Sequence, residues 1–445
     1  MEKNDKFDGL VTDINDDGDG VIKINGAVIF VPNTWLNEEI EGVVINTKSK
    51  FTVAKATKIV SPCEKRITPP CPYALSCGGC TLQHIDYDEQ LRFKKEKLIH
   101  IFKKVATLDI SPENVVASKA FRYRNKISLP VNENKEIGLF RRNSHKILEI
   151  EDCIISKEWV KPLISAVKEY MAKCKITGYN ETSKTGLIKH IVAREVNGCT
   201  LITIVINGDS LPHCDTLIKK LERIFQSFGL NININKLHSN VILGKTFKHL
   251  YGLKELAIND NDLAYNVTNA SFLQVNDEIA NKIYDKVVSF IDSSDVVINA
   301  YSGAGLLTAR LSKFAKTVYG IEIIKEATES ADNLAKTNNI DNMINICGDC
   351  TIEIPKLLKQ GISNHIVVVD PPRKGCDAKV LESIIQSKPK KIIYVSCNPN
   401  TLARDVKMLV ENGEFSLESI TPYDMFPHTS HVETVALLTQ NTKED

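Results

Sequence analysis

The hydrophobic positions of the chain follow different periodicities in its first, middle and last parts. Between residues 7 and 59, short apolar runs such as GVIKI and AVIFV are separated by turn signals, including Asn25-Gly26. This pattern predicts five short strands. Five strands with glycine-rich turns are typical of an OB-like β-barrel, a fold that often binds RNA. A barrel with a purely structural role is the alternative.

Helix and strand patterns then alternate through the middle of the chain. A basic helix is predicted from Gln90 to Lys104, and strands follow in FRYRNKISLPV and GLFRRNSHKILEI. Basic and aromatic residues mix in these strands, which suits contacts with phosphates and stacking on bases. A run of charge more often marks a solvated face. Residues 160 to 260 continue the alternation without evident chemistry, and the pattern predicts a central α+β domain.

From Leu263 onward, apolar strand patterns alternate regularly with helical ones. Runs such as DVVINA, TVYGIE and HIVVVD each end at a polar residue before a turn or a helical pattern. This alternation predicts a Rossmann-like parallel sheet, in which ligands bind at the carboxyl ends of the strands. We therefore expect a multidomain α/β protein with domains at residues 1–60, 61–262 and 263–445.

Composition agrees with a soluble globular protein and excludes an integral membrane protein. Hydrophobic residues make up 43% and charged residues 25% of the 445 residues, which is typical of domains with full cores. No apolar run approaches the ~20 residues that cross a bilayer. The N-terminus has no apolar signal region, so a cytoplasmic location is expected. The net charge is only +1, so any surface for nucleic acid must be local.

Cysteines are unusually frequent, and several gather in a loop rich in proline and glycine. Cys71, Cys77 and Cys80 form a C-x5-C-x2-C pattern, and either Cys63 or Cys153 could supply a fourth ligand. Three close thiolates with a distant fourth are typical of iron–sulfur clusters and of structural zinc. Because no second C-x2-C pair is near, the spacing favours a four-iron cluster over zinc.

The ends of the predicted strands carry a candidate catalytic cysteine and a nucleotide-type site. Cys397 follows a strand and precedes a helix, a position expected to lower the pKa of its thiol from ~8.5 toward neutrality. A small apolar residue at a strand end is the alternative. Gly303-x-Gly305 matches neither a dinucleotide loop nor a triphosphate loop. An acid one strand further, Glu322, suits a ribose diol, which fits S-adenosylmethionine (SAM).

Together these motifs resemble the RNA uracil-5-methyltransferase family over nearly the whole chain. The similarity is greatest to the bacterial 23S rRNA branch, which has an N-terminal TRAM domain and a four-iron cluster. It is carried by CPYALSCGGCTLQHI with Cys153, SFLQVN, NAYSGAGL, VVDPPRKG, YVSCNPNTLARD and MFPHTSHVETVALL. The resemblance implies SAM-dependent methylation of uridine C5 in 23S rRNA by a monomer that binds RNA and neither DNA nor a membrane.

The resemblance also implies a role for individual residues. Cys397 matches the nucleophile that adds to uracil C6, and Glu433 matches the base that removes the C5 proton. The other matched positions are SAM contacts at Gln274, Tyr301, Glu322, Asp349 and Asp370, uracil-orienting residues at Asp370 and Arg373, and cluster ligands at Cys71, Cys77, Cys80 and Cys153, which leaves Cys63 outside the set. The chain departs from the family at Asn299, where an acid is usual, and at Leu306, where a polar residue is frequent.

The chemistry requires such groups on independent grounds. Uracil C5 becomes nucleophilic once a thiolate adds to C6. A carboxylate with an ordinary pKa near 4.3 is ionised at neutral pH and ready to take the C5 proton.

Two other functions are alternatives. A tRNA uridine-C5 methyltransferase is one, although by resemblance the tRNA branch lacks the barrel and the cluster. A non-catalytic RNA-binding module with a redox-sensing cluster is another, but binding alone needs neither Cys397 nor Glu433.

Overall fold

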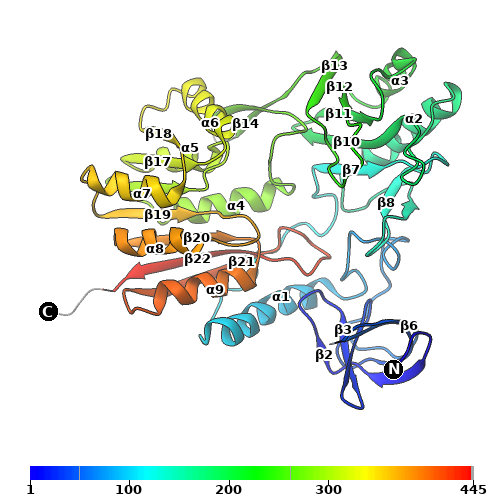
Figure 1. Ribbon diagram of the computed structural model, residues 1–445, viewed down its shortest axis with the longest axis horizontal. Helices are drawn as coiled ribbons and strands as arrows, with labels where there is room; N and C mark the ends of the chain where they lie inside the picture. Colours follow the sequence, from blue (N-terminus) through cyan, green and yellow to red (C-terminus); the bar gives the residue numbers. More distant parts are fainter. Residues whose placement is uncertain (50, 261, 442–445) are drawn as a thin grey trace.

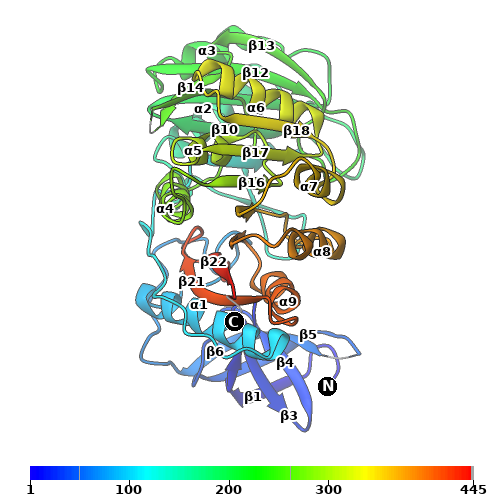
Figure 2. The same cartoon turned by 90° about the vertical axis from the view of Figure 1, so that its left-hand side faces the viewer.

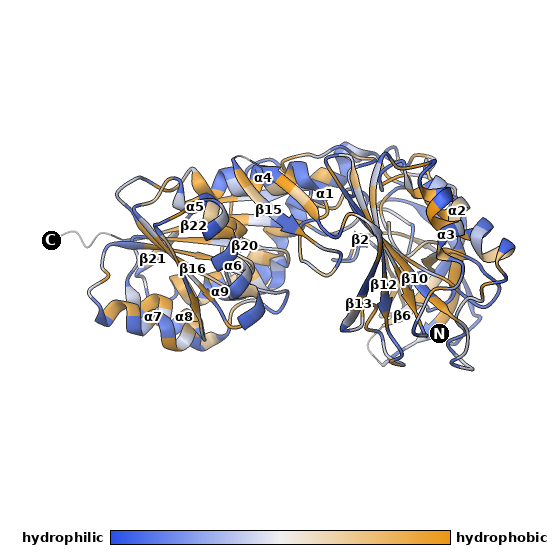
Figure 3. Cartoon of the chain, turned by 90° about the horizontal axis from the view of Figure 1, so that it is seen from above, coloured by the Kyte–Doolittle hydropathy of each residue, from blue (hydrophilic) through white to orange (hydrophobic). Residues whose placement is uncertain are grey.

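The computed structural model describes residues 1–49, 51–260 and 262–441 and shows a mixed α/β fold (Figure 1). Strands in these residues form a six-stranded sheet at the N-terminus, a five-stranded sheet in the middle and a seven-stranded sheet at the C-terminus, with two two-stranded sheets beside them. Figure 3 shows hydrophobic residues concentrated in the sheets and on the helix faces that cover them. Within the described residues, no helix is long and apolar enough to cross a membrane.

The predicted N-terminal strands are all present, together with one more short strand. The run GLVTDI, predicted as a single strand, is divided between β1 and β2. The strands are β1 (Lys6–Leu10), β2 (Asp13–Ile14), β3 (Gly20–Ile24), β4 (Ala27–Val31), β5 (Glu39–Thr47) and β6 (Thr52–Ser61), in the order β1-β5-β6-β4-β3-β2. Alternate residues such as Phe7, Ile22 and Ile40 fill one core between them.

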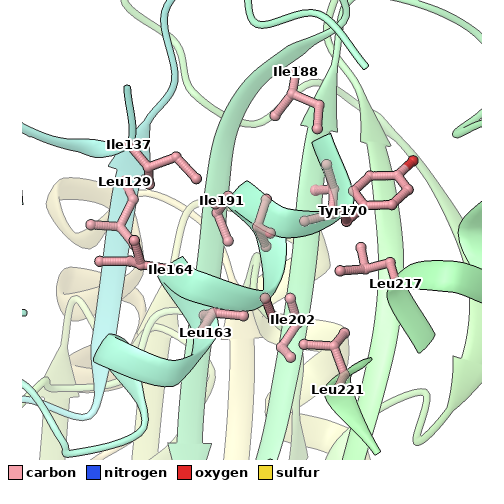
Figure 4. Packing of buried hydrophobic residues seen from close by; sticks show 14 of the residues in the cluster. Leu129, Ile137, Leu163, Ile164, Tyr170, Ile188, Ile191, Ile202, Leu217 and Leu221 are labelled. Carbon is pink, nitrogen blue, oxygen red and sulfur yellow. The ribbon is translucent and has the colours of Figure 1, made fainter. Parts of the chain in front are cut away.

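The central sheet is covered on one face by two helices. Its strands are β7 (Lys126–Pro130), β10 (Ile188–Val196), β11 (Cys199–Ile206), β12 (Ser227–Ile234) and β13 (Thr246–Gly252), in the order β13-β12-β11-β10-β7. The helices are α2 (Val160–Lys173) and α3 (Cys214–Leu221). Figure 4 shows Leu163 and Tyr170 of α2 and Leu217 of α3 packed against Ile191 and Ile202 of the sheet. Beside them, β8 (Gly138–Phe140) and β9 (Ile147–Glu149) form a hairpin.

One helical prediction extends too far in this region. The pattern LIKKLERIFQSF predicts a helix through Phe228, but α3 ends at Leu221. Ser227 and Phe228 instead open β12, where they pair in parallel with Cys199 and Thr200 of β11. Pairing with a neighbouring strand therefore outweighs the local helical period.

The predicted catalytic residues lie at strand ends of the seven-stranded sheet. Its strands are β16 (Val296–Ala300), β17 (Thr317–Glu322), β18 (Met343–Cys347), β19 (His365–Val369), β20 (Lys391–Ser396), β21 (Phe415–Tyr423) and β22 (Glu433–Gln440), in the order β18-β17-β16-β19-β20-β22-β21. Strands β16 to β20 are parallel, and β22 runs antiparallel to both of its neighbours. The strand order reverses between β16 and β19, and the carboxyl ends at such a reversal are where ligands bind.

Helices cover both faces of this sheet. One face packs against α4 (Asp277–Val288) and α5 (Leu306–Ser312), and the other against α7 (Cys350–Lys359), α8 (Ala378–Ser387) and α9 (Pro399–Val410). Helix α6 (Lys325–Thr337) packs beside α5 and β18. The hairpin of β14 (Leu256–Asp260) and β15 (Leu263–Val267) precedes the sheet, and the expected domain boundary at residues 262 and 263 falls inside it.

Helix α1 joins the N-terminal sheet to the C-terminal one. It spans Tyr87–Ile101 and continues as one π-helical segment, Phe102–Ala106, so the predicted helix from Gln90 to Lys104 is present. Figures 1 and 2 both place α1 between the two sheets. Trp35 Nε1 donates to Glu89 on one side (3.1 Å), and Lys94 Nζ contacts Asp424 Oδ1 on the other (2.5 Å).

Candidate active site

The predicted catalytic residues meet at one edge of the seven-stranded sheet. Asp370 follows β19, Cys397 follows β20, and Glu433 begins β22. Because β22 is antiparallel to β20, its first residues lie beside the last residues of β20, and Ser396 pairs with Thr434. The pairing of Val369 with Tyr394 aligns β19 with them. Residues separated by more than sixty positions in the sequence thus come together.

The electrostatics of Cys397 differ from the expectation. Burial, followed by the charges of Glu433 and Asp370, raises the pKa of the thiol to about 11, although Arg373 acts in the opposite direction. A thiol near a helix N-terminus was expected to have a lowered pKa, and this prediction is wrong for the free protein. Half-burial beside two carboxyl groups outweighs both the helix terminus and the Arg373 guanidinium.

The two carboxyl groups are also shifted away from their ordinary range. Burial, together with the charge of Asp370, raises the pKa of Glu433 to about 8, and the side chain of Glu433 is only 5% exposed. Burial raises the pKa of Asp370 to about 7. The expectation that Glu433 is fully ionised at neutral pH is therefore wrong for the free protein. A carboxylate with a raised pKa is a stronger base in the fraction that is ionised.

Two backbone hydrogen bonds hold Glu322, the last residue of β17, in a defined orientation. Glu322 Oε2 accepts a hydrogen bond from Gly303 N (3.0 Å), and Oε1 accepts one from Ile324 N (2.9 Å). Tyr301 precedes this loop with a left-handed φ of 61°, and a side chain at Gly303 would meet nothing within 4 Å. The glycine loop therefore curls around Glu322 and leaves open space in front of it.

Asp349 and two isoleucines complete this part of the edge. Asp349 Oδ1 accepts from both the backbone N and the hydroxyl of Thr351 (2.8 Å each), and the backbone hydrogen bond leads the causes that lower its pKa. Ile323 and Ile352 beside these acids are 67% and 53% exposed. Sequence reasoning missed both, although the apolar residue directly after Glu322 was a signal; Ile352 is separated from Asp349 by Cys350 and Thr351. An acid flanked by exposed apolar side chains suits a nucleoside.

Gln274 lies on the loop between β15 and α4 and lines a cavity of about 120 Å³ that Tyr284 and Leu306 also line. Asn125 Nδ2, from the central sheet region, donates to the Gln274 carbonyl (3.0 Å). The phenol of Tyr284 has a pKa raised by burial and then by the charge of Asp370, so this cavity adjoins the catalytic edge. Asn299 is buried beneath it and donates to Thr308 Oγ1 (2.8 Å).

The cysteine loop packs against the segment that carries Cys153. Gly78 N donates to Phe140 O (3.0 Å), and Glu151 N donates to the Tyr73 hydroxyl (3.1 Å). Burial and the charge of Cys153 both raise the pKa of the three loop thiols, Cys71, Cys77 and Cys80, so the four sulfurs lie near one another. Cys63 instead contacts Glu38 through its backbone N (3.3 Å).

The arrangement of these cysteines does not by itself show a metal centre. All of them are free thiols. Over residues 1–49, 51–260 and 262–441, no group of three or more His, Cys, Asp or Glu side chains is placed to hold a metal ion. Four cysteine sulfurs, those of Cys71, Cys77, Cys80 and Cys153, have the composition of a cluster site. The structure does not show the predicted four-iron cluster.

Several cations that the sequence assigned to an RNA surface have partners within the protein. Lys94 is fully buried against Asp424, Arg122 pairs with Asp152 (2.6 Å), and Arg142 pairs with Asp19 (2.7 Å). Periodicity could not reveal these pairs because each partner is distant in sequence or in a loop. These three residues therefore hold elements together.

Comparison with known proteins assigns the chain to a family. The family model for tRNA (uracil-5-)-methyltransferase matches residues 86–441, which is most of the chain. The chain belongs to the RNA uracil-5-methyltransferase family.

Two kinds of relative extend the family match to the N-terminus. An uncharacterized RNA methyltransferase of Staphylococcus aureus (strain COL) is 37% identical over 448 residues, covering 98% of each chain. One from Staphylococcus epidermidis (strain ATCC 12228) is 35% identical and covers 100% of this chain and 99% of its own. The tRNA (uracil-54, C5)-methyltransferase of Pyrococcus abyssi, solved with S-adenosyl-L-homocysteine (SAH), superposes with a TM-score of 0.78 at 30% identity, covering 97% of this chain and 99% of its own.

Proposed function

We propose that this uracil-5-methyltransferase methylates uridine C5 in 23S rRNA, with SAM as methyl donor, through a covalent bond between Cys397 Sγ and uracil C6. The observation that carries the proposal is the meeting of Cys397, Glu433, Asp370 and Arg373 at one sheet edge, where each side chain influences the pKa of another. Binding alone would require no such arrangement of a thiol and two carboxyl groups.

Each group then has a defined task. The Cys397 thiol first loses its proton to water, the thiolate sulfur forms the S–C6 bond, and the C5=C6 electrons make C5 nucleophilic as charge moves onto O4. SAM supplies the methyl group that C5 accepts. Glu433 then takes the C5 proton, and the electrons of that C–H bond restore C5=C6 while the S–C6 bond breaks. Arg373 lowers the pKa of both Cys397 and Glu433, so it stabilises the two anionic states that the reaction needs.

The methyl donor is assigned to the strand ends that precede the catalytic ones. Glu322 and Asp349, whose carboxylates accept backbone hydrogen bonds, would hold the ribose, and the exposed Ile323 and Ile352 would suit the adenine ring. SAH in the Pyrococcus abyssi relative supports SAM as the methyl donor. Gln274 would approach the methionine end of SAM from the other side of Leu306. Asn299 and Leu306, the two positions at which the chain differs from the family, carry no charge and no reacting group. The proposed reaction therefore does not depend on them.

The choice of RNA rests on the resemblance to the 23S rRNA branch. The N-terminal strands and the cysteine loop of that branch are both present here, and we assign the former to a TRAM-type RNA-binding domain. A tRNA substrate is the second candidate, favoured by the Pyrococcus abyssi tRNA enzyme, which matches 97% of this chain. Because that match includes the N-terminal sheet, the sheet alone does not separate the two substrates.

Product analysis tests the proposal and separates these candidates. The protein is incubated with methyl-labelled SAM and either a 23S rRNA transcript or a pool of unmodified tRNA transcripts, and the RNA is digested to nucleosides. We expect labelled 5-methyluridine from the 23S transcript. Label in tRNA alone would replace the rRNA assignment, and label in another nucleoside would contradict the mechanism.

We also propose that Cys71, Cys77, Cys80 and Cys153 hold a four-iron cluster, with zinc as the alternative. The nearness of the four sulfurs supports the proposal, and metal binding would require these thiols to lose their protons. Bound iron and sulfide would cross-link the loop to the segment around Cys153. Elemental analysis is expected to give about four iron atoms for each chain.

A further inference from the structure

We propose that Arg404 and Asp405 of α9 are positioning residues that hold the loop carrying Asp370 and Arg373 in place beside Cys397. The inference rests on the proposed function, since it concerns the same reaction. Both residues belong to the motif YVSCNPNTLARD, and the mechanism described above gives neither of them a task.

The loop between β19 and α8 runs past the catalytic edge, with Pro372, Arg373 and Lys374 exposed and Cys376 buried. Arg373 and Lys374 both face solvent, and the hydrogen bond from Gly375 N to Pro372 O (2.8 Å) closes a single turn. A turn of this kind fixes its own shape but not its distance from Cys397. That distance has to be set by contacts with a neighbouring element.

Two consecutive side chains of α9 bind the far end of this loop. Asp405 Oδ2 accepts from Cys376 N (2.8 Å). Arg404 Nη2 donates to the carbonyl oxygens of Lys374 and Cys376 (3.1 Å each). Arg404 Nε also donates to Asp405 Oδ1 (2.8 Å), so the two side chains form one unit. Together they satisfy three backbone groups of the loop.

The near end of the loop is tied to the residue that follows the nucleophile. Asn398 Nδ2 donates to Arg373 O (3.0 Å), and Thr401 Oγ1 lies 3.4 Å from the same oxygen. Asn398 also caps α9 by accepting from Asn400 N (3.1 Å). The start of α9 and the backbone of Arg373 are therefore fixed to each other directly after Cys397.

The packing at Gly375 shows how close this contact is. A Cβ at Gly375 would lie 2.6 Å from both Asp405 Oδ2 and Arg404 Nη2, and its φ of +77° also favours glycine. On the other side, the hydroxyl of Tyr394, from the strand that leads to Cys397, donates to Asp405 Oδ2 (2.6 Å). Asp405 is fully buried, so these donors replace water around its charge.

The position of the loop matters because Arg373 is the cation that acts on both reacting groups. A loop released from α9 would leave Cys397 and Glu433 with their burial but without a fixed positive charge. A displacement of ~1 Å at a reacting centre can cost on the order of 10²-fold in rate. Asp405 thus acts on the reaction without touching the substrate.

The test compares Asp405→Asn with the wild-type protein in single-turnover methylation of the RNA substrate. We expect the rate to fall on the order of 10²-fold, while the Kd for SAH, measured by calorimetry, changes by much less. Asp370 is the one matched SAM contact on this loop, and Glu322 and Asp349 lie at other strand ends. Glu411→Gln is the matched control, since it removes a carboxylate from an exposed pair with Lys407 at the end of the same helix. It should keep the wild-type rate.

A double-mutant cycle with Arg373→Ala distinguishes positioning of the Arg373 loop from a general destabilisation of the fold. If Asp405 acts through the loop, Asp405→Asn slows the Arg373→Ala protein much less than it slows the wild type. A wild-type rate in Asp405→Asn, or equal losses in both backgrounds, would overturn the proposal. If Asp405→Asn does not fold, Tyr394→Phe replaces it in the same double-mutant cycle. This substitution removes one hydrogen-bond donor to Asp405 and keeps the aromatic ring. Wild-type protein that does not methylate RNA would instead refute the proposed function.

Discussion

At the scale of single residues, the catalytic edge favours neutral groups before RNA binds. Cys397 and Glu433 both have raised pKa values, of about 11 and about 8. The sequence could identify these residues through their motifs and their places at strand ends. It could not predict their ionisation, because the neighbours that determine it come from β19, β20 and β22. Burial beside another carboxyl group is a property of the fold.

Replacing Glu433 by Gln is expected to stabilise the protein at high pH. A carboxyl group whose pKa is raised to about 8 contributes its full stability below the ordinary value near 4.5, and that stability is lost as pH rises through 8. Gln cannot ionise, so Glu433→Gln should melt at about 2 °C or more above the wild type at pH 9 and differ little at pH 5. Calorimetric melting at both pH values measures this. A difference that is the same at both values would contradict the raised pKa, and Glu411→Gln is the surface control.

At the scale of elements, the parallel strands could be predicted because their apolar runs are long and end at polar residues. The antiparallel insertion of β22 between β20 and β21 could not, since no local pattern records which strand pairs with which. The end of α3 was missed for the same reason. The Lys94–Asp424 pair shows the limit of charge patterns, because the helix predicted as basic carries one fully buried lysine.

Removal of that buried lysine should destabilise the protein strongly. Lys94→Ala leaves the Asp424 carboxylate buried, with a side-chain hydrogen bond from the Tyr87 hydroxyl (2.8 Å) but without the lysine charge. Breaking a buried pair typically costs about 3–5 kcal/mol, measurable by urea unfolding. Lys104→Ala, at an exposed position of the same helical segment, should change stability by less than about 0.5 kcal/mol. Equal effects of the two substitutions would show that the pair contributes nothing.

At the scale of the whole molecule, the cysteine loop is in direct contact with the loop that leads into the strand of Glu433. Thr81 N and Leu82 N both donate to His428 O (2.9 and 3.0 Å), and His428 lies between β21 and Glu433, the first residue of β22. The sequence identified the two motifs separately and placed each in its region. Their contact depends on how α1 packs between the sheets, which pattern reasoning does not reach.

Removal of iron is expected to weaken the fold, because the proposed cluster would fix Cys80 directly beside Thr81. Treatment with a chelator under reducing conditions should lower the melting temperature by about 2 °C or more. The measurement pairs calorimetry with iron analysis of the same samples, and a Cys63→Ser variant should keep both its iron and its melting temperature. Loss of iron with unchanged melting and unchanged RNA binding would contradict a stabilising role.

The central claim, covalent catalysis by Cys397 with release by Glu433, is tested most directly with RNA that contains 5-fluorouridine. Fluorine cannot leave as a cation, so elimination stops after methyl transfer. With SAM present, the wild-type protein should form an RNA–protein complex that survives a denaturing gel, and Cys397→Ser should form none. Absence of the complex from the wild type, or an undiminished complex with Cys397→Ser, would contradict the account.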